Sequence, residues 1–174
     1  VLMQIALLMR LKIGETEMAT IVIPRYNKRM KVILNDGGRQ KAGFNFQFPA
    51  TDCATRAIAI CLDIPYNDAY DMVEKFCRTE KPSKTRKGKS SASSGVHKVT
   101  MDKLMDALGF TWVPTMAIGS GCTVHMKPDE LPSGWIIVRL SRHYAAVIDG
   151  VLHDNHDCTR DGSRCVYGYW KLTN

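Results

Sequence analysis

One cysteine lies where its thiol could act as a nucleophile. Cys53 directly follows Asp52, at the predicted start of a helix over residues 52–62. The unpaired amides and the positive dipole end of a helix N-terminus favour a thiolate over a thiol. Because the thiolate is the nucleophilic form of cysteine, this position predicts covalent catalysis. The alternative interpretation is a small buried packing residue.

An amide side chain precedes this cysteine at a short distance in the sequence. Gln47 lies six residues before Cys53, in the segment FNFQFPATDC. There it could donate a hydrogen bond to a developing oxyanion, together with the backbone N–H of the cysteine. Taken alone, Gln47 is better explained as a polar loop residue.

The segment SRHYAAVIDGVLHDNHD supplies imidazole and carboxylate groups. An Asp-Gly pair, residues 149–150, separates two apolar runs, which is typical of a β-hairpin with a two-residue turn. Such a turn pairs Ile148 with Val151. Every other opposed pair of the hairpin then follows from this one.

This register selects one of the two nearby aspartates as the partner of His143. His143 and Asp154 project to the same face as diagonal neighbours, about 7–8 Å apart between backbones. A carboxylate there can fix the imidazole tautomer that takes a proton from a thiol. Asp157 would point to the opposite face, so the hairpin predicts a Cys53–His143–Asp154 triad.

The elements that must position these residues suggest an α+β domain, with helices in the first half and strands mainly in the second. Hydrophobic periodicity and capping signals predict helices over residues 52–62, 67–80 and 100–109. Alternation and turn residues predict strands at 20–23, 31–34, 111–115, 134–140, 143–148, 151–155 and 165–172. The cysteine helix is apolar nearly all round, so we expect it to be central and buried.

The composition divides the chain into an arm and one domain. Residues 1–41 form a basic N-terminal arm, of which the part before Met18 is possible upstream translation. Residues 42–174 form the domain, interrupted by a basic segment, 81–98, that is rich in Lys, Ser and Gly. We expect this segment to be a flexible surface loop.

The net charge of +7 is concentrated in those two segments. Nucleic acid or an acidic protein is therefore a conceivable partner of the loop, although a solvated charge run is the simpler interpretation. The basic side chains that would make this contact are Lys81, Lys84, Arg86, Lys87 and Lys89.

The chain resembles the papain-like cysteine peptidases, in the order Gln47, Cys53, His143, Asp154. It is most similar to the bacteriocin-processing (double-glycine) peptidases and to small phage-encoded homologues. The segments that carry this likeness are TDCATRAIAI, IPYNDAYDMV, LGFTWVPTM and RHYAAVIDGVLHD, within residues 42–172. Ala54 stands where the processing peptidases commonly have glycine, so the likeness does not extend to double-glycine specificity.

The resemblance implies a papain-like fold, in which a buried helix carrying the cysteine packs on a C-terminal antiparallel sheet carrying the histidine and the aspartate. It implies that Cys53 is the nucleophile, His143 the general base and acid, Asp154 the orienting residue and Gln47 the oxyanion donor. It further implies a thiol protease, phage-encoded, acting on a peptide or protein substrate without a cofactor. A transamidase or deamidase could use the same triad.

The composition also predicts a cytoplasmic protein, in the bacterial host if phage-encoded. The apolar run VLMQIALLM is far shorter than the ~20 residues of a membrane helix, so no membrane contact is expected. Arg10 and Lys12 follow this run instead of preceding it, unlike a signal peptide. We therefore expect free thiols at all six cysteines: 53, 61, 77, 122, 158 and 165.

Two other classes of function compete with the enzyme. One is a non-catalytic binding protein that uses the basic loop. The other is a zinc-stabilised interaction module, whose ligands would come from Cys122, His125, His153, His156, Cys158 and Cys165. These spacings match no common zinc motif, so no metal is expected.

Overall fold

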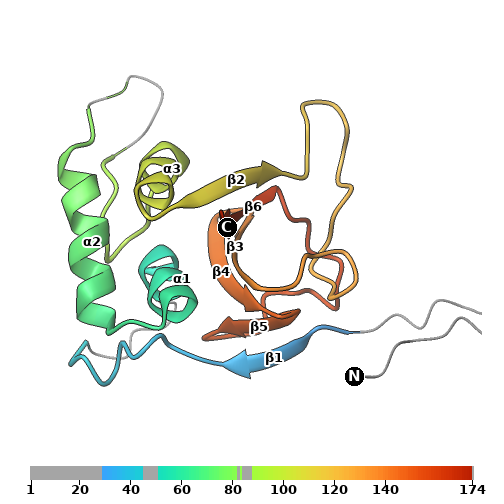
Figure 1. Cartoon of the computed structure of the whole chain (residues 1–174), viewed down its shortest axis with the longest axis horizontal. Coiled ribbons are helices and arrows are strands. Elements are labelled where there is room, and N and C mark those ends of the chain that lie inside the picture. The colour runs from blue at the N-terminus through green and yellow to red at the C-terminus, as the bar shows by residue number, and fades with distance from the viewer. Residues whose placement is uncertain (1–28, 45–50, 82, 84–87, 174) are drawn as a thin grey trace, which may run out of the picture.

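The computed structural model describes residues 29–44, 51–81, 83 and 88–173. In this part of the chain, three helices pack on a six-stranded sheet (Figure 1). The helices are α1 (Cys53–Leu62), α2 (Tyr66–Arg78) and α3 (Lys98–Ala107). This arrangement confirms the predicted α+β class.

The sheet has the strand order β1-β5-β4-β3-β6-β2. The strands are β1 (Lys31–Leu34), β2 (Phe110–Pro114), β3 (Trp135–Leu140), β4 (His143–Ile148), β5 (Val151–Asp154) and β6 (Gly168–Leu172). Strands β2 to β6 pair antiparallel, as predicted, whereas β1 pairs parallel with β5. The sheet is therefore mixed and not purely antiparallel.

Strand β1 also changes the expected boundary between the arm and the domain. Lys31 is opposite Val151 and Leu34 is opposite Asp154 in the register of β1 and β5. The backbone N–H of Asn35 extends this pairing by a 2.8 Å hydrogen bond to the carbonyl of Asp154. Residues 29–41 thus belong to the domain, because they fill an edge of its sheet. The predicted strand 20–23 lies outside the described residues.

Helix α1 is the central element of the helical layer. Every residue from Cys53 to Cys61 is buried, because α1 contacts α2 on one side and strands β3, β4 and β5 on the other. Helix α2 begins one residue before the predicted Asn67, with Pro65 at its N-cap. Helix α3 begins at Lys98, two residues earlier than predicted.

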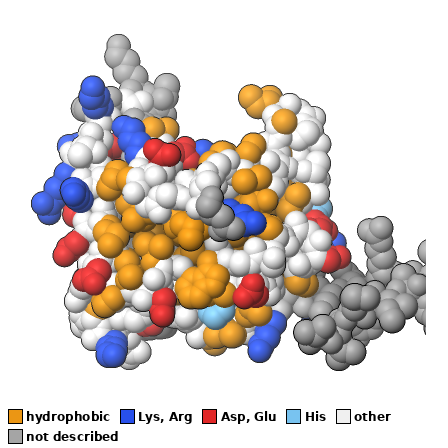
Figure 2. Space-filling model, in the orientation of Figure 1, with side chains coloured by type: hydrophobic (Ala, Val, Ile, Leu, Met, Phe, Trp, Pro, Cys, Tyr) orange, Lys and Arg blue, Asp and Glu red, His pale blue; other side chains and the backbone are white. Residues whose placement is uncertain are grey.

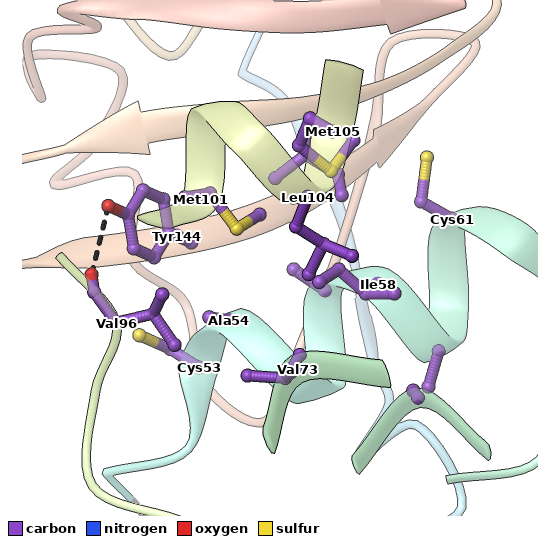
Figure 3. Packing of buried hydrophobic residues seen from close by; sticks show 14 of the residues in the cluster. Cys53, Ala54, Ile58, Cys61, Val73, Val96, Met101, Leu104, Met105 and Tyr144 are labelled. Carbon is purple, nitrogen blue, oxygen red and sulfur yellow. Dashed lines mark hydrogen bonds between the residues drawn. The ribbon is translucent and has the colours of Figure 1, made fainter. Parts of the chain in front are cut away.

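The alternation of side chains along the strands builds two hydrophobic clusters, one on each face of the sheet. Ile137 and Ala146 face the helices and join the cluster drawn in part in Figure 3. Ile136 and Val147 face the opposite side, where Met126 completes a second cluster. Figure 2 shows that hydrophobic side chains also reach the surface between the helices and the sheet, with charged side chains around them.

The segment expected to be a flexible basic loop is packed in its second half. Ala92 and Val96 are buried. The Thr55 hydroxyl of α1 donates a 2.7 Å hydrogen bond to the carbonyl of Ala92. Within residues 88–97 the segment is therefore partly buried and hydrogen-bonded to α1, so it does not lie wholly on the surface. Of its five proposed basic contacts, Lys81 and Lys89 are exposed, and the others lie outside the described residues.

The prediction that all six cysteines are free was wrong for two of them. Cys122 and Cys165 form a disulfide with a Cα–Cα distance of 5.8 Å. An isolated β-bridge between His125 and Cys165 brings the two segments together. The disulfide removes two thiolates from the zinc alternative, so that ligand set is not assembled. Cys53, Cys61, Cys77 and Cys158 are free and buried.

Among the described residues, no helix combines the length and the apolar composition that crossing a bilayer requires.

Candidate active site

Three elements bring the predicted triad residues to one end of the sheet. Cys53 is the first residue of α1, His143 the first of β4 and Asp154 the last of β5. Because β4 and β5 form an antiparallel hairpin, the start of one strand lies beside the end of the other. Helix α1 packs against β4 and presents its N-terminus there.

The hairpin has the register that the sequence predicted. Ile148 is opposite Val151, as a two-residue turn requires. The turn residues Asp149 and Gly150 both have positive φ angles, 49° and 75°. Type I′ turns require this conformation at both central positions, and it matches the twist of the flanking strands.

His143 and Asp154 are in direct contact. The Nε2 atom of His143 lies 2.5 Å from Oδ2 of Asp154. Asp157 instead accepts hydrogen bonds from the backbone N–H and the hydroxyl of Thr159, at 2.8 and 2.6 Å. The predicted choice of Asp154 over Asp157 as the neighbour of His143 is therefore confirmed.

The imidazole of His143 also interacts with the thiol of Cys53. Burial alone would lower the pKa of His143, but hydrogen bonds to Asp154, Cys158 and Cys53 raise it to about 11. An ionised carboxylate only accepts hydrogen bonds, so Nε2 is the nitrogen that donates to Asp154. Nδ1 is the remaining ring nitrogen that can interact with the thiols of Cys53 and Cys158. The site thus favours an imidazolium beside the cysteine at neutral pH.

Cys53 is 9% exposed, and it is bordered by Val96 and Tyr144, as Figure 3 shows. The Tyr144 hydroxyl donates a 3.2 Å hydrogen bond to the carbonyl of Val96, which ties the two neighbours together. Asp52 occupies the predicted N-cap position, but its side chain makes no capping hydrogen bond. The Asp52 side chain therefore does not satisfy the backbone N–H groups of the first turn. Gln47 lies outside the described residues.

Arg56 is a further member of the site that no sequence motif predicted; it is 1% exposed and contacts Asp154 from α1. Its Nη1 lies 2.7 Å from Oδ1 of Asp154, and its Nε lies 3.1 Å from Oδ1 of Asp52. Asp52 also pairs with Arg39 at 2.9 Å and accepts a 2.5 Å hydrogen bond from Tyr66. The signal in the sequence was a single charged residue within an otherwise apolar helix, CATRAIAICL.

These contacts determine the charge state of the carboxylate. Burial would raise the pKa of Asp154, but His143 and Arg56 lower it below its usual range. Burial raises the pKa of Cys158, a second thiol beside His143, and the hydrogen bond to His143 opposes that rise only in part. Asp154 is therefore ionised at neutral pH, and Cys158 is a protonated thiol.

The site also contains the one group of potential metal ligands found among the described residues. The ligand atoms of His143, Asp154 and His156 lie within 4.8 Å of one another. However, both oxygens of Asp154 are already engaged, one by His143 and the other by Arg56. Because the Arg56 guanidinium already neutralises this carboxylate, the arrangement suits proton transfer better than cation binding.

Comparison with known proteins found no matching family model, no matching curated protein and no matching solved structure. What can be said of the site therefore comes from its own geometry. It is a buried thiol–imidazole–carboxylate arrangement, with the thiol at a helix N-terminus.

Proposed function

We propose that this chain is a thiol hydrolase that cleaves an amide or isopeptide bond through Cys53, His143 and Asp154. The observation that carries the proposal is the contact between His143 Nε2 and Asp154 at 2.5 Å, together with the hydrogen bond to Cys53 that helps to raise the pKa of His143. In this arrangement an imidazole can accept the thiol proton and then give a proton to the departing amine.

The chemistry proceeds in two steps that balance without a cofactor. The Cys53 sulfur attacks the carbonyl carbon, and the imidazolium gives its proton to the departing amine as the C–N bond breaks. Water then attacks the carbonyl carbon of the resulting thioester and gives a proton to the imidazole. The C–S bond breaks, and a carboxylic acid and the Cys53 thiolate are released. In the first step, the backbone N–H of Cys53 and the side chain of Gln47 stabilise the oxyanion.

The burial of the charged groups also supports a catalytic role. Asp52, Arg56 and Asp154 are all at most 2% exposed. Replacing buried ion pairs by well-packed apolar side chains is often neutral or stabilising, so such pairs are poorly explained by stability alone. A requirement for an ionised carboxylate behind His143 explains them directly.

The test is to incubate the protein with a library of peptides and to identify the products by mass spectrometry. We expect hydrolysis by the wild type and none by the Cys53→Ala or His143→Ala variants, both folded. Cys77→Ala is the matched control, because Cys77 is another free, buried cysteine, on α2. Added hydroxylamine should intercept the thioester as a hydroxamate.

The products also distinguish hydrolysis from related reactions of the same thioester. Water as acceptor cleaves the peptide, deamidation converts Gln to Glu, and a second amine yields a new amide. Cleavage that persists in folded Cys53→Ala would refute the proposal.

A further inference from the structure

A buried chain of alternating charges leads away from the proposed catalytic residues. It runs from His143 to Asp154, then to Arg56 of α1, then to Asp52 and finally to Arg39. Each member is paired with groups of the opposite charge, at distances of 2.5 to 3.1 Å. Arg56 is the central member of this chain.

Arg56 controls which oxygen of Asp154 is available to His143. Oδ1 of Asp154 accepts from Nη1 of Arg56 at 2.7 Å and from the backbone N–H of Asn155 at 2.8 Å. Oδ2 faces His143. With Oδ1 held by two donors, the carboxylate cannot rotate away from the imidazole without breaking both bonds.

Arg56 also connects this carboxylate to the nucleophile. Its second hydrogen bond, from Nε, goes to Asp52, the residue directly before Cys53. One guanidinium therefore joins the residue before the thiol to the residue behind the imidazole, across 98 positions of sequence between Arg56 and Asp154. The planar fork of arginine can bond two carboxylates at fixed angles, whereas the single ammonium of lysine cannot.

We propose that Arg56 is a positioning residue, which holds Asp154 toward His143 and thereby keeps the Cys53–His143 pair aligned. This inference rests on the proposed function. It assigns to Arg56 no contact with the substrate. Among the described residues, other ionisable groups near this cluster lie on several elements: Tyr66 on α2, Tyr144 on β4, Cys158 beside His143, Arg164, and the exposed His156, whose ring lies 5.2 Å from that of His143.

The experiment measures alkylation of Cys53 by iodoacetamide at about pH 6 and about pH 9, by peptide mass spectrometry. For an isolated thiol, the alkylation rate at pH 6 should be about 200-fold lower than at pH 9, because a much smaller fraction of the thiol is ionised at pH 6. In the wild type we expect the two rates to differ by less than about tenfold, since an aligned imidazolium favours the thiolate. This readout requires no substrate.

The principal variant is Arg56→Lys, which retains the charge but not the fork. We expect the ratio of the rate at pH 6 to the rate at pH 9 to fall by about three- to tenfold. Arg78→Lys is the matched control, because Arg78 is exposed on α2 and should leave the ratio unchanged. Circular dichroism and a cooperative thermal transition verify folding. A folded Arg56→Lys variant with the wild-type ratio overturns the proposal.

If Arg56→Lys does not fold, Asp52→Asn tests the proposal instead. The deciding result is whether this variant raises or lowers the ratio of the alkylation rate at pH 6 to the rate at pH 9. Losing the negative charge beside Cys53 would directly favour the thiolate and raise the ratio. Releasing the second anchor of Arg56 would misalign the pair and lower it. A lower ratio supports the positioning role, and an unchanged or higher ratio overturns it.

The wild-type measurement separates this inference from the proposed function. If wild-type Cys53 behaves as an isolated thiol, both proposals fail. If it reacts well at pH 6 but Arg56→Lys does so equally, only the positioning role fails.

Discussion

At the scale of single residues, His143 lies between the carboxylate and the thiols of the proposed site. Its Nε2 contacts Asp154, and the ring also interacts with two thiols, Cys53 and Cys158. Only Cys53 lies at a helix N-terminus, where the backbone amides favour an anion. Burial instead keeps Cys158 protonated. The same imidazole therefore has one thiol suited to nucleophilic attack and one suited to packing.

The two aspartates near His143 should respond differently to the same substitution. We expect Asp154→Asn to lower kcat/KM by about 10²-fold or more, because a neutral amide stabilises the imidazolium poorly. Asp157→Asn, which changes only contacts to Thr159, should stay near the wild-type value. Kinetics on a cleaved peptide, with folding checked by circular dichroism, would measure both. Equal losses would show that the hairpin does not identify the functional carboxylate.

At the scale of the elements, the segment 88–97 packs beside Cys53 through Val96. Hydrogen bonds to Glu80 hold this segment in place. Glu80 lies just beyond the end of α2, and it accepts hydrogen bonds from the backbone N–H of Ser90 at 2.8 Å and from its hydroxyl at 2.5 Å. The hydroxyl of Thr100 on α3 is a third donor. Burial would raise the pKa of Glu80, but these hydrogen bonds lower it to about 2.

Because the pKa of Glu80 is lowered, its contribution to the stability of the fold depends on pH. A carboxylate whose pKa is lower in the folded than in the unfolded state stabilises the fold above its ordinary value of 4.5. That contribution is lost as the pH falls from 4.5 through about 2. We therefore expect Glu80→Gln to lower the urea midpoint at neutral pH, and the difference from wild type to shrink toward pH 2. Asp71→Asn is the control, because Asp71 is an exposed carboxylate on α2. A difference that does not change with pH would contradict this account.

At the scale of the whole molecule, two long-range connections join segments that are distant in the sequence. One is the parallel pairing of β1 with β5, which places a strand beside the hairpin that carries His143 and Asp154. The other is the Cys122–Cys165 disulfide, which closes a loop of 43 residues between β2 and β6. The strand pairing is lost on unfolding, whereas the disulfide persists and restricts the unfolded chain.

The disulfide should contribute measurably to the free energy of unfolding. We expect the double variant Cys122→Ser, Cys165→Ser to lose about 2–4 kcal/mol, as is usual for loops of this length. Urea denaturation under oxidising conditions would measure the loss. Dithiothreitol should lower the midpoint of the wild type but leave that of the double variant unchanged. Equal sensitivity of both proteins to the reductant would contradict a stabilising role for this bond.

The sequence by itself determined the features that depend on neighbouring residues. The periodicity of α1, the positive-φ turn at Asp149 and Gly150 and the alternation of β4 and β5 are all local features. The turn and the alternation together are sufficient to place His143 beside Asp154, with no contribution from distant segments. Local patterns predict such features because the interacting residues are close in the chain.

Only the tertiary structure decided the contacts between distant segments. One partner of Arg56, Asp154, lies 98 residues away, and β1 pairs with β5 across most of the domain. Ala92 and Val96 are likewise buried by segments distant in the sequence. No periodicity records such pairings, since they depend on how whole layers pack. The sequence therefore shows an arginine, Arg56, within an apolar helix, but only the fold shows that it joins the carboxylates of Asp52 and Asp154.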